Sequence, residues 1–120
     1  MTSKFRDINN CRPVDWGQVL GEGVTNKYPS DIDGILERNG KFLVLEWKHS
    51  SVTELPKGQE ILLKRLAGLP DFEVFVIYGS YDTWEVDRIW MVKRDDGPKP
   101  YTRKTLIEAM RVWWQWASAQ

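Results

Sequence analysis

The sequence predicts an α/β or α+β domain in which a mixed β-sheet is flanked by helices. Its 120 residues, 42% of them hydrophobic, match one domain with one core, so a single domain over 1–120 is expected, with 1–12 as a loose polar arm. Asn39-Gly40 lies between two apolar runs and predicts a β-hairpin, because both residues tolerate the positive φ of a type I′ turn. The apolar run 74–78 is typical of a strand covered on both faces.

The other elements follow from apolar spacing and from helix-ending glycines. The expected order is a short helix around Trp16, Val19 and Leu20, a hairpin over 31–48, a helix over 57–67, strands over 74–78 and 88–92, and a helix over 102–117. Gly21 and Gly23 end the first helix, and Gly68 ends the second. The last helix carries apolar side chains on one face: Leu106, Ala109, Met110, Trp113 and Ala117.

The composition excludes several chemistries. One Cys and one His cannot supply a structural zinc site or a disulfide framework, and a nucleophilic triad would depend on His49 alone. The 17 basic and 17 acidic residues give zero net charge, which argues against bulk nucleic-acid binding. Without an apolar leader or a membrane-length stretch, and with the lone Cys11, an intracellular, cytoplasmic protein is expected; a phage protein acting in its host cell would meet the same expectation.

The hairpin brings charged residues together. With Asn39-Gly40 as a two-residue loop, opposing residue numbers sum to 79, so Asp33 faces Glu46 and Asp31 faces Lys48, all on one face of the two strands. Opposed like charges are destabilising, and a divalent cation would resolve the conflict between the two carboxylates. Lys48 beside a metal suits a site that must also bind an anion, such as a phosphodiester.

Each of these residues also has an ordinary structural explanation. Asp31 and Lys48 could form a plain cross-strand ion pair, which is as well supported as a metal role for Asp31. Asp33 could be a surface turn residue near Gly34, and Glu46 and Lys48 could be the solvated end of a strand. Their convergence at the end of an apolar run favours a functional site over the sum of these explanations.

At these residues the sequence resembles the PD-(D/E)XK nuclease superfamily. The matching segments are 29–34, the hairpin, and Glu46-Trp47-Lys48 as the E-x-K half. More narrowly, it is similar to the VRR-NUC domains and the archaeal Holliday-junction resolvases, with Gln59 in the following helix and strand 74–78 adding to the likeness. Here Pro29 is followed by Ser30, where the family pattern has Asp directly after Pro. The resemblance implies a restriction-endonuclease-like core of αβββαβ-like order.

The resemblance also implies a function and its residues. Asp33, Glu46 and the Trp47 backbone carbonyl would hold Mg²⁺ or Mn²⁺, with Asp31 or Glu22 as further candidate ligands. Lys48 would orient the attacking water or stabilise developing charge, and Gln59 would reach the active site or hydrogen-bond the sheet. The implied activity is that of a metal-dependent DNA endonuclease, with branched or junction DNA as a candidate substrate and no organic cofactor. A non-catalytic DNA- or protein-binding module with this fold, and a single-strand or RNA nuclease, stay open as alternatives.

Two features bear on partners. Between Arg88 and Arg111 the sequence has seven basic residues and three acidic ones. This excess is explained either by an ordinary solvated surface or by a DNA-binding surface whose candidates are Lys93, Arg94, Arg103 and Lys104. In the last helix Trp113 belongs to the apolar face, whereas Trp114 and Trp116 point elsewhere. A homodimer interface is expected for them, with stacking on unpaired bases as the second option. His49, opposite in direction to Lys48, is expected at the surface or at an edge.

Overall fold

The computed structural model describes residues 14–21, 23, 29–94 and 97–120. The chain divides into two compact units, Met1–Ser30 and Asp31–Gln120. In the first unit, helix α1 (Trp16–Leu20) begins where the Asp15 side chain accepts the N–H of Gln18 at 3.3 Å, and it ends at Gly21, as expected. The proposed arm 1–12 and the candidate ligand Glu22 lie outside the described residues.

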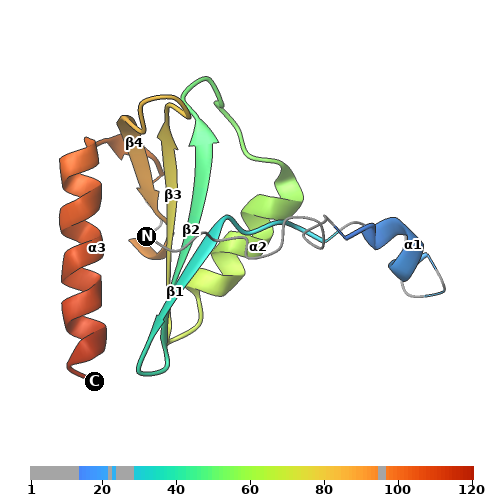
Figure 1. The fold of residues 1–120 in the computed structure, drawn as a ribbon, viewed down its shortest axis with the longest axis horizontal. Coiled ribbons are helices and arrows are strands. Elements are labelled where there is room, and N and C mark those ends of the chain that lie inside the picture. Colours follow the sequence, from blue (N-terminus) through green and yellow to red (C-terminus); the bar gives the residue numbers. More distant parts are fainter. Residues whose placement is uncertain (1–13, 22, 24–28, 95–96) are drawn as a thin grey trace, which may run out of the picture. The chain divides into compact units, whose positions relative to one another are not determined.

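The second unit is a five-stranded mixed sheet between two helices (Figure 1). Its elements are β1 (Gly34–Arg38), β2 (Lys41–His49), α2 (Lys57–Ala67), β3 (Phe72–Gly79), β4 (Val86–Met91), a 3₁₀ turn (Val92–Arg94), β5 (Lys99–Pro100) and α3 (Arg103–Ser118). The strands lie in chain order, and all pairs are antiparallel except β2–β3, which is parallel. Helix α2 makes the crossover that a parallel pair requires. The mixed sheet flanked by helices confirms the predicted α+β class.

The hairpin has the predicted geometry. Asn39 and Gly40 have φ of 52° and 80°, and the pairing runs from Arg38↔Lys41 to Gly34↔Leu45, each pair summing to 79. The Asn39 side chain also donates to the carbonyls of Ala117 and Ser118 at 3.1 and 3.3 Å, so the turn is joined to the end of α3.

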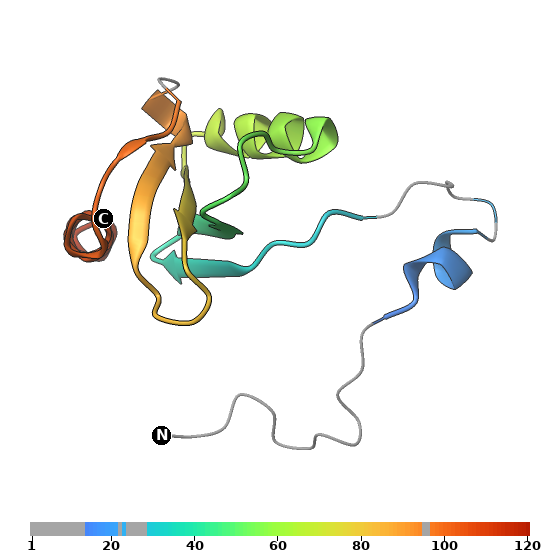
Figure 2. The same cartoon turned by 90° about the horizontal axis from the view of Figure 1, so that it is seen from above.

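Each face of the sheet packs on its own helix. Figure 2, seen from above, shows α2 on one side of the sheet and α3 on the other. The core on the α2 side contains Val44, Leu63, Val74, Val76 and Tyr78, among others. The core on the α3 side contains Leu43, Phe75, Ile77, Ile89 and Trp113, among others. Residues 74–79 of β3 are all buried, which confirms a strand covered on both faces.

Two details differ from the expected order. The first strand begins at Gly34 rather than at 31, because the Asp33 side chain, and not a backbone carbonyl, accepts the N–H of Trp47. In the described residues, two strands rather than the three of an αβββαβ order precede α2. As a consequence β2 extends beyond β1, and residues 46–49 have an unpaired edge on that side. None of the described helices has the length and apolar character needed to cross a membrane.

Candidate functional site

Glu46 is the only charged or polar residue among those described that is buried, with 4% of its surface exposed. The alternation of β2 places it on the face covered by α2, between Val44 and Lys48. Its Oε1 lies 3.7 Å from Lys48 Nζ, whereas Oε2 is buried with no hydrogen-bond partner. Burial raises the pKa of Glu46, and the nearby Asp33 carboxylate raises it further, against the opposing effect of Lys48. The charged form of this carboxyl is therefore costly to maintain.

Asp33 lies next to Glu46, at the exposed start of β1. Its Oδ2 accepts the backbone N–H of Trp47 at 2.6 Å, which fixes the carboxyl across the unpaired edge of β2. Asp33 and Glu46 therefore lie close together, but they are not paired in the strand ladder, which ends one residue earlier at Gly34↔Leu45.

Lys48 occupies the same face one step further along β2. Its side chain is 21% exposed, so the ammonium is partly desolvated and still open to an approaching ligand. In the sheet Lys48 lies beside Tyr78, which in turn pairs with Arg88. The Arg88 guanidinium lies over the Tyr78 ring at 4.2 Å and donates to the carbonyls of Ser50 and Val52 at 2.7 and 2.8 Å. Arg88 thus anchors the segment that follows Lys48, a role that its charge alone did not indicate.

Helix α2 brings Gln59 to the same carboxyl. The Gln59 side chain lowers the pKa of Glu46, in opposition to Asp33, so its amide is close enough to favour the charged form. Its own Oε1 is buried without a hydrogen-bond partner. Gln59 therefore contacts the sheet at Glu46, and its role in an active site stays a prediction.

The Trp47 carbonyl lies on the unpaired edge of β2. Within a strand the N–H and C=O of one residue point to the same side, so this carbonyl shares the side on which Asp33 contacts the Trp47 amide. Its partner is the Tyr81 hydroxyl, which donates to it over a long 3.4 Å. Sequence reasoning missed Tyr81; the available signal was an aromatic residue in the turn that follows the buried strand 74–78.

These atoms form an oxygen-rich set that fits a hard cation. Glu46 Oε2 and Gln59 Oε1 are buried acceptors without partners, and the Asp33 carboxylate and Trp47 carbonyl add oxygen ligands of the kind that Mg²⁺ prefers. Over the described ranges, no three Asp, Glu, His or Cys side chains come together. Asp31, which is exposed, therefore does not complete a three-carboxylate cluster with Asp33 and Glu46. Lys48 forms its ion pair with Glu46 and not with Asp31, the partner considered from the sequence.

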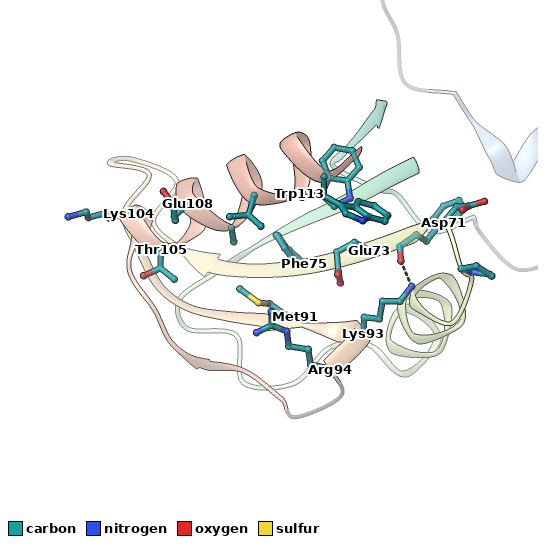
Figure 3. A pocket seen from close by; sticks show the side chains of 15 residues that line it. Asp71, Glu73, Phe75, Met91, Lys93, Arg94, Lys104, Thr105, Glu108 and Trp113 are labelled. Atoms are coloured by element: carbon teal, nitrogen blue, oxygen red, sulfur yellow. Dashed lines mark hydrogen bonds between the residues drawn. The ribbon is translucent and has the colours of Figure 1, made fainter. Parts of the chain in front are cut away.

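The basic residues expected to bind DNA lie elsewhere. Lys93, Arg94 and Lys104 line a cavity of about 870 Å³ between α3 and the sheet (Figure 3), on the face opposite Glu46. Lys93 Nζ donates to the carbonyls of Leu69 and Phe72 at 3.0 and 2.8 Å, so it anchors the segment that connects α2 to β3. Arg103, in the first turn of α3, does not line this cavity. The local charge excess therefore does not converge on the carboxylate pair.

The tryptophans of α3 separate as expected, with Trp113 buried and Trp114 and Trp116 exposed. The exposed rings lie against cations of the hairpin: the Arg38 guanidinium is 5.2 Å from the Trp114 ring and Lys41 Nζ is 5.7 Å from the Trp116 ring. Homodimer formation through them stays a prediction. His49 is exposed, stacked on Tyr81 with ring centroids 6.0 Å apart, which confirms its surface position.

No protein-family model, no curated protein and no solved structure matches this chain. The function of the chain is therefore inferred from the geometry of Asp33, Glu46, Lys48 and Gln59.

Proposed function

We propose that the chain is a metal-dependent deoxyribonuclease that hydrolyses phosphodiester bonds at Asp33, Glu46 and Lys48, in the manner of the PD-(D/E)XK nucleases. The observation that carries the proposal is the state of Glu46. It is 4% exposed, it lies beside a second carboxylate, and one of its oxygens has no partner. Burying an incompletely paired carboxylate generally lowers the stability of a fold by several kcal/mol. A purely structural role for Glu46 would not explain why the chain keeps such a group.

A divalent cation suits this arrangement. Asp33, Glu46 and the Trp47 carbonyl would hold Mg²⁺ or Mn²⁺, with Gln59 supporting Glu46 from α2. When bound, such an ion lowers the pKa of a bound water and stabilises charge on a phosphate. The unpartnered oxygens of Glu46 and Gln59 support the proposal, because a cation or its water ligands would satisfy them.

The protein's own groups supply the remaining requirements. The Lys48 ammonium, 3.7 Å from Glu46 Oε1 and partly open to solvent, would donate to a phosphate oxygen or orient the attacking water. The bond from the Trp47 N–H to Asp33 holds the carboxyl and the adjacent carbonyl on one edge. Past Leu45 this edge of β2 carries the Asp33 carboxyl and the Tyr81 hydroxyl in place of a partner strand, and the proposal places the phosphodiester beside these groups.

The decisive experiment is a cleavage assay on supercoiled plasmid, 5′-flap and four-way-junction DNA, with Mg²⁺, Mn²⁺ or EDTA. Metal-dependent cutting is expected for the wild type, with preference for the branched substrates, and it should be lost in Lys48→Ala. Lys57→Ala is the matched control, because Lys57 is an exposed lysine at the start of α2. Full activity of Lys48→Ala, or cutting in EDTA, would refute the proposal.

A second measurement separates this function from that of a non-catalytic module. Isothermal titration with Mn²⁺ should give binding that disappears in Asp33→Asn and in Glu46→Gln. A protein that binds DNA but neither binds Mn²⁺ through these residues nor cuts any substrate would be a binding module.

A further inference from the structure

The turn between β3 and β4 carries two large aromatic side chains that are half exposed. Tyr81 and Trp84 each leave 52% of their surface in contact with solvent. Their rings meet edge to face, with centroids 6.4 Å apart and an interplanar angle of 88°. Burial of such rings is favourable, and rings held in water next to a candidate active site are typical of surfaces that bind a partner.

The turn holds these rings in a fixed arrangement. Ser80 Oγ accepts the N–H groups of Asp82 and Thr83, and the Ser80 carbonyl accepts that of Trp84 at 3.2 Å. Trp84 has φ of 60°, a conformation that a bulky residue adopts only when its surroundings impose it. A Cβ at Gly79 would collide with the Glu85 carbonyl and the Trp47 ring, so the chain passes closely behind the turn.

The same rings contact Trp47, whose side chain packs on the α3-side core and whose backbone carbonyl is a candidate metal ligand. The Tyr81 hydroxyl donates to the Trp47 carbonyl at 3.4 Å, and the Trp47 and Trp84 rings pack edge to face at 5.5 Å. The N–H of Trp47 is bound by Asp33. One residue, Trp47, therefore joins the aromatic turn to the carboxylate pair.

The charges in the turn select which part of a nucleotide could bind there. Asp82 lies between the two aromatic residues in the chain and Glu85 follows Trp84, and both repel phosphates. Lys48, on the face of β2 opposite the Trp47 ring, attracts them. A ring face can stack on any unpaired base without a charge contribution. Bases inside a continuous duplex are already stacked and must first be unpaired to reach such a surface.

We infer that Tyr81 and Trp84 form a stacking platform for an unpaired nucleobase, so that the substrate class is DNA with a single-stranded segment next to the cleaved bond. The position of the cleaved bond rests on the proposed nuclease function, whereas the binding of an unpaired base does not. The Trp114 and Trp116 rings lie against Arg38 and Lys41, and the Tyr81 ring is itself stacked on His49. The platform is preferred over Trp114 and Trp116 because it contacts Trp47, next to the carboxylate pair.

The test measures binding of the full chain to a fluorescein-labelled oligothymidylate and to a hairpin duplex of the same length, by anisotropy in EDTA. The wild type should bind the single strand more tightly than the duplex. Tyr81→Ala and Trp84→Asn should each weaken single-strand binding by roughly 5- to 100-fold, the range expected for one base stacked on one ring. Asn is chosen at 84 because it tolerates a positive φ.

Conservative and remote variants complete the test. Tyr81→Phe and Trp84→Phe keep a ring and should bind within a few-fold of the wild type, whereas Trp116→Ala, which removes an equally exposed ring on α3, should not change binding. Equal affinity for single strand and duplex would overturn the inference, as would unchanged single-strand binding by Tyr81→Ala and Trp84→Asn with native circular dichroism spectra.

Cleavage assays separate this inference from the proposed function. If the platform variants bind single strands weakly but the wild type cuts no DNA with Mg²⁺ or Mn²⁺, the platform stands and the nuclease proposal fails. If the wild type cuts DNA and the platform variants keep the same ratio of flap to duplex cleavage, the nuclease proposal stands and the platform is refuted.

Discussion

Two glutamates on opposite faces of the sheet have pKa values shifted in the same direction but differ in their hydrogen-bond partners. Glu46 faces α2 and Glu73 lies on the α3 side, and burial raises the pKa of both. Around Glu73 three groups partly offset the effect of burial: its Oε1 accepts the N–H of Val74 at 3.2 Å, and Lys93 and Arg94 lower its pKa. Around Glu46 a second carboxylate opposes the charge and Oε2 has no partner.

The contrast between the two glutamates indicates that Glu46, and not Glu73, is the candidate functional residue. A raised pKa by itself marks burial, and structural ion pairs perturb pKa values as active sites do. What distinguishes Glu46 is that one of its two oxygens, Oε2, has no hydrogen-bond partner, although Lys48 and Gln59 are adjacent. Glu73 is the matched structural reference within the same sheet, and four predictions use it in that way.

The largest expected effect is on cleavage. Lys48→Ala should lower the rate of DNA cleavage about 100- to 1,000-fold, because it removes one preorganised cation from the place where negative charge develops. Single-turnover cleavage of flap DNA measures the effect, with unfolding midpoints to show that the variant is folded. A rate within a few-fold of the wild type would place Lys48 with Lys93 as a structural cation.

The second prediction concerns metal-linked stability. Mg²⁺ or Mn²⁺ at about 100 times its dissociation constant should raise the free energy of unfolding by about 2.7 kcal/mol in the wild type and in Glu73→Gln. Glu46→Gln should show no such increase, because a ligand is lost. Thermal unfolding with and without the metal measures the difference. Equal stabilisation of the two variants would remove the distinction between the glutamates.

The third prediction concerns Lys93 near Glu73. Lys93→Ala should lower the free energy of unfolding by about 1–3 kcal/mol, because the carbonyls of Leu69 and Phe72 lose a charged hydrogen-bond donor. Urea titration measures this, and cleavage by the folded variant should be unchanged. A selective loss of DNA affinity with unchanged stability would instead support the nucleic-acid role first expected for Lys93.

The smallest effect is the pH dependence of the metal-free protein. Because the pKa of Glu46 is raised on folding, the native state holds this proton more tightly than the unfolded chain does. The resulting stability is present below the ordinary pKa of 4.5 and is lost as the pH rises through the folded value. Glu73 has the same sign.

In EDTA, Glu46→Gln should therefore exceed the wild type in melting temperature at pH 8, and the advantage should disappear toward pH 4. Glu73→Gln should gain less, because Lys93 and Arg94 already compensate its charge. A Glu46→Gln variant that is less stable than the wild type at pH 8 would show that the charged carboxylate contributes net stability without a metal.

The two glutamates also show the extent of sequence-based prediction. The hairpin register followed from Asn39-Gly40 and placed Asp33 and Glu46 together, because a two-residue loop leaves one pairing. The nearly complete burial of Glu46 could not follow, since it depends on α2 packing over that face. The basic residues near Glu73 were expected to bind DNA, yet a local charge count does not reveal the face on which the side chains lie.

By itself the sequence determined the helices, the hairpin and its register, and through the register the proximity of Asp33 and Glu46. These follow from local backbone preferences and from apolar periodicity, which act over a few residues. Only the tertiary structure decided that Glu46 has an unpartnered oxygen, that Tyr81 reaches the Trp47 carbonyl, and that Lys93 lies on the opposite face. Those contacts join residues far apart in the chain, and they depend on how the β2–α2–β3 crossover and α3 pack against the sheet.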